Sequence, residues 1–431
     1  MGIPAVAGIP GVRLAAAAAA APSPPMTAVA IPMPVYPTRR PQVIAAALRQ
    51  LEAGDWTRLE GAPELEADLA AWHGPGVDGR APTVWVVSSG TAALEAIMLG
   101  HEIGPGDEVI TTPNTWGATV SAILAIGAIP VFADILPDSG LIDPASVAAA
   151  ITPRTRAILC VHLYGHPCAA RELRELADRH GLLLLEDGSQ AHGARLHGRR
   201  VGGWGHASAF STMGLKLLAG TEGGYAVFHD PAAAERAALY GRHPRGLAPE
   251  AAARLGAAGL LDALQLGWRP CAVSAALVRA ALPYLDEENA ARRRNAARLR
   301  AGLAGCAGVR LPEELPGAEG CYHLLSLVLT DACPHPPEAV VARLSAAGIG
   351  AFRYIPVPIH RLARLNPEGY QGPRVFWHEQ LRRAGVDYRR IRLPHAEARA
   401  ARSVETGFNW TVDAPETMAQ WAAAIRAAVG P

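Results

Sequence analysis

The sequence predicts an α/β protein with a large domain built on a mostly parallel sheet and a smaller α/β domain at the C-terminus. Short apolar runs alternate with segments of helical spacing between about residues 83 and 228. Most of these runs lack the alternation of a strand with one face in water, so we expect a sheet buried on both faces. The length of 431 residues also suits two domains better than one.

Seven apolar runs are expected to be the strands of the large sheet. In chain order they are TVWVVS, DEVITT, AIPVFADI, TRAILCVHL, LLLLED, HASAFS and GGYAVF. The segments between the first five runs have helical spacing, as do two earlier segments that begin near Pro41 and Ala62. The predicted sheet therefore lies between helices.

The domain boundaries follow from the change of pattern along the chain. A long helical pattern begins near Val273, and we expect Pro283 to kink it. We assign residues 39–285 to the large domain and residues 286–431 to the smaller one. Residues 1–38 are rich in alanine and proline and are expected to form a flexible tail, with Met26 as an alternative start. A secretory signal is disfavoured because only Arg13 precedes the alanine run.

Composition excludes several classes of function. Half of the residues are apolar and 18% are charged, and the formal net charge is +1, so no charge excess favours nucleic acid or an anionic membrane. No apolar run has the length of a membrane-spanning helix. The six cysteines form no C-x-x-C pair, which favours reduced thiols in the cytoplasm over disulfides or a zinc site.

Lys216 is the only lysine in the sequence, and all the other residues in the total of 40 lysines and arginines are arginine. A coding bias towards arginine would replace a surface lysine at little cost to folding. It would not replace a lysine whose amine does chemistry, because arginine forms no Schiff base and stays protonated at working pH. Lys216 lies among small and apolar residues, which favour the neutral, nucleophilic amine. We therefore expect a covalent role, with a surface lysine as the alternative.

Three further features lie where predicted strands end, the edge at which open α/β sheets bind ligands. The turn SSGTAAL (88–94) can hold a phosphate with free N–H groups and hydroxyls, or is an ordinary N-cap. Asp187 ends the most apolar strand, where it either meets a cationic ring nitrogen or caps a helix. Glu186 is expected to point to the opposite face. Trp116 either stacks on a flat heterocycle or is a core tryptophan.

Together, a phosphate cradle, a stacking aromatic side chain, a buried acid and a lone lysine describe a pyridoxal phosphate pocket. The order and spacing of GDWTRL, SSGTAAL, LLEDGSQAHGARLHGRRVG and AFSTMGLKLLAGTEGG strengthen this interpretation. Over residues 41–425 the sequence resembles the DegT/DnrJ/EryC1/StrS group of sugar and cyclitol aminotransferases. This resemblance implies fold-type I, with a seven-stranded sheet in the large domain.

The resemblance also implies roles for particular residues around the cofactor ring. Lys216 would form the Schiff base with pyridoxal 5'-phosphate and move a proton between substrate and cofactor carbons. Asp187 would pair with the pyridine nitrogen, Gln190 would lie near the phenolic oxygen, and Trp116 would stack on the ring.

Further positions of the motifs are implied to surround the cofactor phosphate. Gly90, Thr91 and Ser211 would bind it, and His162 would lie nearby. We expect a homodimer with the active site at the subunit interface, since family members use a G-x-N-x-R stretch to reach the neighbouring subunit's phosphate. Here Gly267 occupies the asparagine position, and Arg269 is kept.

The implied reaction transfers an amino group from L-glutamine or L-glutamate to a keto-cyclitol or keto-sugar in the biosynthesis of a secondary metabolite such as an aminoglycoside-like antibiotic. The sequence STMGLK resembles the cyclitol branch. Two alternatives on the same fold are a lyase or dehydratase, which Lys216 disfavours, and an aromatizing synthase of the aminohydroxybenzoate synthase kind. A non-catalytic protein that uses the cofactor pocket as a sensor is a third.

Overall fold

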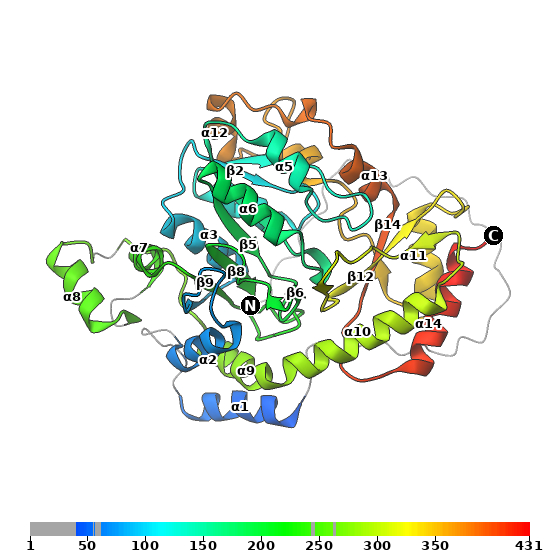
Figure 1. The fold of residues 1–431 in the computed structure, drawn as a ribbon, viewed down its shortest axis with the longest axis horizontal. Coiled ribbons are helices and arrows are strands. Elements are labelled where there is room, and N and C mark those ends of the chain that lie inside the picture. The colour runs from blue at the N-terminus through cyan, green and yellow to red at the C-terminus, as the bar shows by residue number, and fades with distance from the viewer. Residues whose placement is uncertain (1–39, 55, 57–61, 243–245, 262–263) are drawn as a thin grey trace, which may run out of the picture.

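The computed structural model describes residues 40–431 except for residues 55, 57–61, 243–245 and 262–263. The predicted tail, residues 1–38, lies outside the described residues, as does most of the GDWTRL motif. The described residues form two larger sheets and one small sheet with surrounding helices, as drawn in Figure 1.

A seven-stranded sheet forms the centre of the N-terminal part. Its strands are β1 (Thr83–Val87), β2 (Glu108–Thr111), β3 (Ile129–Phe132), β4 (Thr155–Val161), β5 (Leu183–Asp187), β8 (Ala207–Ser211) and β9 (Gly224–Phe228). Their spatial order is β1-β9-β8-β5-β4-β2-β3. The neighbours from β8 to β3 run parallel, and only β9 runs antiparallel to both of its neighbours. The prediction of a mostly parallel, seven-stranded sheet is confirmed.

Helices cover both faces of this sheet, as the apolar runs without alternation predicted. On β1, Trp85 and Val87 pack into one buried cluster with α3 (Gly90–Gly100) and α7 (Pro231–Gly241). Val84 and Val86 point to the other face, where they pack with α2 (Pro63–His73). The remaining helices of this part are α1 (Pro41–Glu52), α4 (Gly117–Ala125), α5 (Pro144–Ala150), α6 (Ala170–His180) and α8 (Pro249–Ala257).

A kinked helix connects the two sheets. The segment α9 (Ala272–Ala281) is followed by a 3-10 turn that contains Pro283, and then by α10 (Leu285–Gly302). This break confirms the predicted kink at Pro283. It forms because proline lacks the N–H that a continuous helix needs. Figure 1 shows α10 running from the side of the large sheet to α14 (Pro415–Val429).

The C-terminal part contains a four-stranded antiparallel sheet in the order β10-β12-β14-β13. Its strands are β10 (Val309–Arg310), β12 (Leu324–Leu329), β13 (Ala351–Phe352) and β14 (Ser403–Gly407). Residues of α10, α11 (Pro337–Ala346) and α14 pack into one apolar cluster with this sheet. A small third sheet joins β6 (Arg195–Leu196), β7 (Arg199–Arg200) and β11 (Ala318–Glu319).

One C-terminal segment packs against the large sheet instead. It contains α12 (Trp377–Arg383) and α13 (Pro394–Arg402). Leu381 and Tyr388 are buried with Phe132 of β3 and Leu124 of α4, and Tyr388 Oη donates a hydrogen bond to the carbonyl of Pro130 (2.6 Å). The division of the chain at residue 285 stays a prediction.

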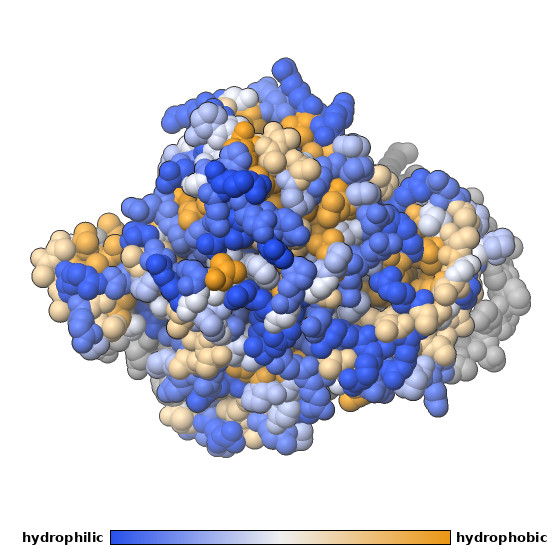
Figure 2. Space-filling model, viewed as in Figure 1, coloured by the Kyte–Doolittle hydropathy of each residue, from blue (hydrophilic) through white to orange (hydrophobic). Residues whose placement is uncertain are grey.

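The surface in Figure 2 is mainly hydrophilic, and apolar residues appear there in separate groups. No helix among the described residues combines the length and the apolar character needed to cross a membrane.

Candidate active site

A cavity of about 560 Å³ opens where β4, β5 and β8 end. It lies between these strand ends, the first turns of α3 and α4, and residues of the C-terminal part. Seven of the eight predicted site residues line it: Gly90, Thr91, Trp116, Asp187, Gln190, Ser211 and Lys216. The eighth, His162, is buried beneath it. The parallel strands therefore bring together residues that lie up to 126 positions apart in the chain.

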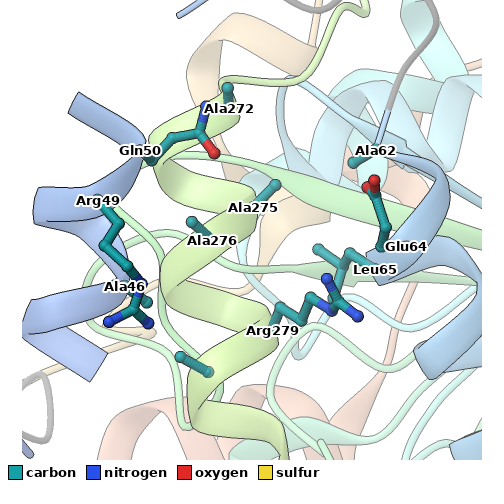
Figure 3. A pocket seen from close by; sticks show the side chains of 11 residues that line it. Ala46, Arg49, Gln50, Ala62, Glu64, Leu65, Ala272, Ala275, Ala276 and Arg279 are labelled. Atoms are coloured by element: carbon teal, nitrogen blue, oxygen red, sulfur yellow. The ribbon is translucent and has the colours of Figure 1, made fainter. Parts of the chain in front are cut away.

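A second cavity, of about 350 Å³, lies between α1, α2 and α9 (Figure 3). Much of its lining is alanine, and its charged side chains come from the three helices. Arg279 of α9 donates a hydrogen bond to Asp68 of α2 (2.6 Å), and the two side chains form an ion pair. This lining offers no nucleophile among the described residues, so the chemistry points to the first cavity.

Lys216 lies in the turn that follows β8. Its backbone N–H donates to the carbonyl of Met213 (2.8 Å), and further along the turn the N–H of Gly220 donates to the carbonyl of Thr212 (2.7 Å). Burial lowers the pKa of Lys216 to about 8, although the nearby Asp187 carboxylate acts in the opposite direction. A larger fraction of the amine is therefore neutral near physiological pH than in an exposed lysine.

Asp187 is a buried carboxylate at the carboxyl end of β5. Its Oδ2 accepts a hydrogen bond from Thr119 Oγ1 (2.8 Å), and its Oδ1 accepts one from the backbone N–H of Ser189 (3.1 Å). Thr119 Oγ1 also contacts Thr115 Oγ1 at 2.9 Å. Two donors leave lone pairs of the carboxylate unused, so Asp187 can accept a further bond from a cationic N–H in the cavity.

Gln190 is held at both ends of its amide. Its Oε1 accepts a hydrogen bond from the backbone N–H of Tyr164 (2.8 Å), and its Nε2 donates one to Tyr354 Oη (2.8 Å). Both bonds connect the turn after β5 with residues far away in the chain. They orient Gln190 at the cavity wall.

Trp116 is the N-cap residue of α4 and lies at the mouth of the cavity. Its ring stacks on that of Tyr354, with centroids 5.4 Å apart and planes at 27°. The side chain is 57% exposed, which excludes the alternative of a core tryptophan.

The turn between β1 and α3 approaches Ser211 very closely. A Cβ atom on Gly90 would lie 2.6 Å from Ser211 Cβ, so only glycine fits here without movement. Ser89 Oγ accepts from the N–H of Ala92 (3.0 Å), so the alternative of an ordinary N-cap is present as well. The N–H groups of the first turn of a helix lack partners within the helix, and Gly90 and Thr91 of this turn line the cavity together with Ser211.

His162 and Glu186 form a buried pair behind the cavity. Glu186 Oε2 lies 3.1 Å from His162 Nε2 and also accepts a hydrogen bond from the N–H of Gly202. Glu186 Oε1 accepts from the N–H groups of Trp204 and Gly205. Glu186 therefore points away from Asp187, as predicted, and His162 supports β5 rather than touching the cavity.

Cys160, His162 and Cys168 lie close enough together to offer three ligands to a metal ion. The lone pair of His162 Nδ1, however, already accepts the backbone N–H of Cys168 (3.1 Å). The neighbouring Cys168 thiol and burial raise the pKa of Cys160, which disfavours the thiolate that a metal would need. We therefore interpret these three buried side chains as part of the hydrogen-bonded core and not as a metal site.

Several residues of the cavity wall were not predicted from the sequence. Thr119 lies in the first turn of α4, four residues after Thr115, and the two hydroxyls are in contact although Thr115 itself precedes the helix. His323, Phe352 and Tyr354 come from the C-terminal part, and no local pattern connects them with the motifs.

Gly267 and Arg269 are exposed and do not line the cavity. Ser274, a few residues later, contacts the segment that follows Lys216. Its Oγ lies 2.5 Å from Thr221 Oγ1 and accepts from the N–H groups of Thr221 and Glu222 (3.3 Å each).

Comparisons with known proteins agree with this geometry. Residues 38–378 match the DegT/DnrJ/EryC1/StrS aminotransferase family. The chain is 38% identical over 336 residues to the dTDP-3-amino-3,4,6-trideoxy-alpha-D-glucose transaminase of Streptomyces venezuelae, covering 75% of this chain and 80% of the relative. It is 35% identical over 350 residues to the L-glutamine:2-deoxy-scyllo-inosose aminotransferase of Streptomyces kanamyceticus, covering 78% and 79%.

A solved structure of 3-amino-5-hydroxybenzoic acid synthase is similar with a TM-score of 0.78 and 28% identity, covering 93% of this chain and 99% of that one. The predicted family, fold class and cofactor are confirmed. The chain belongs to the DegT/DnrJ/EryC1/StrS aminotransferase family and is a pyridoxal-phosphate-dependent aminotransferase of fold-type I.

Proposed function

We propose that the cavity around Lys216 holds pyridoxal phosphate and that Lys216 carries the covalent chemistry. The observation that carries this proposal is the presence of Lys216 and Asp187 in one cavity, with the cradle of Gly90, Thr91 and Ser211 in its wall. The residues fit the cofactor: there is an amine for its aldehyde, a carboxylate for its ring nitrogen and N–H and hydroxyl donors for its phosphate.

The chain's own residues divide the chemical work. When bound, pyridoxal phosphate supplies an aldehyde that condenses with amines and a ring that accepts an electron pair. Asp187 would bind the ring N–H and keep it protonated. Lys216 Nζ, with a pKa near 8, can take up a proton and return it at neutral pH. Trp116 covers the mouth of the cavity and limits the access of water.

We propose further that the amino group passes from L-glutamine or L-glutamate to a keto-cyclitol or keto-sugar in the biosynthesis of an antibiotic. The relatives support this, since one acts on 2-deoxy-scyllo-inosose with L-glutamine and another on a dTDP-linked sugar. A homodimer with the active site at the subunit interface is also proposed. Leu264 supports it, because this side chain, directly before the QLGWRP stretch, is 84% exposed. The six free cysteines support the cytoplasm as the compartment.

The test uses the full chain loaded with pyridoxal phosphate. On addition of L-glutamine or L-glutamate we expect the absorbance of the aldehyde form of the cofactor to give way to that of the amine form. A keto-cyclitol or a nucleotide-linked keto-sugar should then restore the first spectrum. Lys216→Ala should abolish the change, and no change of the wild type with either donor would contradict the proposal.

A further inference from the structure

The orientation of Gln190 determines where the hydroxyl hydrogen of Tyr354 can point. A backbone N–H only donates, so the atom 2.8 Å from the Tyr164 nitrogen must be the amide oxygen of Gln190. The amide nitrogen then donates to Tyr354 Oη. Because Tyr354 accepts this bond, its own O–H remains available to donate elsewhere.

Tyr354 lines the cavity beside Gln190. Its ring is fixed by the stack on Trp116 and by an edge contact with Tyr164 at 5.8 Å. Burial raises the pKa of Tyr354, so the phenol stays protonated. Within the described part of the chain, the recorded bond of Tyr354 Oη is the one that it accepts from Gln190.

Glu405 of β14 holds Tyr354 from behind the cavity. Its Oε2 accepts a hydrogen bond from the backbone N–H of Tyr354 (2.9 Å). Its Oε1 accepts from Tyr164 Oη (3.1 Å) and from Ser326 Oγ (3.0 Å). The Glu405 carboxylate thus fixes both residues that hold the Gln190 amide. Tyr354 accepts a hydrogen bond from the amide nitrogen of Gln190, and the backbone N–H of Tyr164 donates one to its amide oxygen.

Glu405 is fully buried and does not line the cavity. Burying a carboxylate is unfavourable unless hydrogen bonds and an opposite charge compensate for the lost hydration. Here the three donors and the electrostatic interaction with buried Arg399 do so. An apolar residue would fill this place without needing such compensation, so the carboxylate indicates a need for fixed orientation.

We infer that Tyr354 donates a hydrogen bond through its phenolic O–H to an oxygen of the ligand in the Lys216 cavity, and that Glu405 is the positioning residue for Tyr354. The inference rests on the proposed function of this cavity. The ligand oxygen belongs either to the cofactor or to the keto acceptor, and both offer the lone pairs that this donor needs.

The central variant is Tyr354→Phe, which removes the hydroxyl and keeps the ring on Trp116. Tyr388→Phe is the matched control, since Tyr388 is also buried and loses one hydrogen bond, but lies outside the cavity. Three quantities are measured on each holoenzyme: the dissociation constant of pyridoxal phosphate, the pH midpoint of its absorbance titration, and KM for the acceptor.

If the cofactor accepts the bond, Tyr354→Phe should weaken cofactor binding by about tenfold and move the absorbance midpoint. If the acceptor substrate accepts it, KM should rise by about tenfold while the cofactor quantities and the reaction with glutamate remain unchanged. Tyr388→Phe should change none of the three. A Tyr354→Phe enzyme that matches the wild type in all three overturns the inference, while activity of the wild type with glutamate shows separately that the proposed function holds.

Glu405 is tested by rescue. Glu405→Ala should change the same quantity as Tyr354→Phe, and the double variant should show no further change, because both substitutions disturb one donor. Glu405→Gln should restore nearly wild-type values. Its amide oxygen can accept from the Tyr354 N–H while the hydroxyls of Tyr164 and Ser326 reverse to accept from its amide nitrogen. If Glu405→Ala folds and lowers only the melting temperature, leaving all three quantities at their wild-type values, Glu405 is not a positioning residue. If Glu405→Ala does not fold, Tyr354→Phe decides, and wild-type values of all three quantities in that variant overturn the role of Glu405.

Discussion

Thr119 Oγ1 donates a hydrogen bond of 2.8 Å to Asp187 Oδ2, and this contact connects the first turns of α4 to the end of β5. The bond restrains the carboxylate at the base of the cavity while leaving it able to accept a further N–H. The position of the carboxylate therefore depends on a helix that lies 68 residues earlier in the chain.

Replacing Asp187 with asparagine should reduce kcat by about 10²–10³-fold, the size of effect seen when one preorganised electrostatic partner of a reaction is removed. Asparagine keeps the shape but not the negative charge that, in the proposed role of Asp187, would hold a proton on the cofactor ring. Thr119→Val leaves the charge in place and removes about 1 kcal/mol of hydrogen bonding, so its kcat should fall by less than about tenfold. Steady-state kinetics with glutamate and a fixed acceptor compares the two. Equal losses in both variants would contradict the assigned role of the charge.

Lys216 should react with pyridoxal phosphate in a pH-dependent way that reflects its lowered pKa. The rate at which the apoprotein forms the Schiff base should rise with a midpoint near pH 8, since burial lowers the pKa of Lys216 to about 8. Stopped-flow absorbance over a pH series measures this rate. A midpoint near the ordinary lysine value of 10.5 would count against a buried, activated amine.

The same shift predicts how stability changes with pH. Between pH 8 and 10.5 the unfolded chain keeps a proton on Lys216 that the folded protein has lost. Unfolding therefore takes up a proton in this window, and the free energy of unfolding should rise with pH there. The gain relative to Lys216→Met should be at most about 3 kcal/mol. Urea denaturation of both apoproteins at pH 8 and pH 10 measures the difference.

The sequence predicted the large sheet well because buried parallel strands have a strong local signature. The strand-end rule also predicted Asp187 as a site residue, since it ends β5 and ligands bind at the edge where parallel strands end. Ser211 ends β8, but it was predicted only from the resemblance to the family. Tyr354 and Glu405 could not be found this way. Their positions depend on hydrogen bonds between residues 51 to 241 positions apart, and no local pattern reports such contacts.

Gly90→Ala should destabilise the protein and weaken cofactor binding together. The new Cβ would lie 2.6 Å from Ser211 Cβ and 3.1 Å from its Cα, so the backbone itself has to move, at a cost of about 1–3 kcal/mol. Gly117→Ala is the matched control, because Gly117 also begins a helix but has no atom within 4 Å of a new Cβ. The free energy of unfolding of Gly117→Ala should stay the same or rise by up to about 1 kcal/mol.

Denaturant titration measures the stability of both variants, and fluorescence measures their binding of pyridoxal phosphate. A Gly90→Ala protein as stable and as tight in binding as Gly117→Ala would show that the close approach to Ser211 is not required.

Leu264→Asp should weaken the proposed homodimer. Leu264 is 84% exposed, and Leu260 and Leu266 beside it are 49% and 47% exposed, which forms an apolar group that a partner surface could cover. A carboxylate at the centre of such an interface would be buried without a partner, at a cost of several kcal/mol. Val412→Asp is the control, since Val412 is 65% exposed on a different part of the chain, between β14 and α14. Light scattering coupled to size exclusion should show a dimer for the wild type and for Val412→Asp, and a concentration-dependent shift towards the monomer for Leu264→Asp. A Leu264→Asp protein that remains dimeric at low concentration would place the interface elsewhere on the chain.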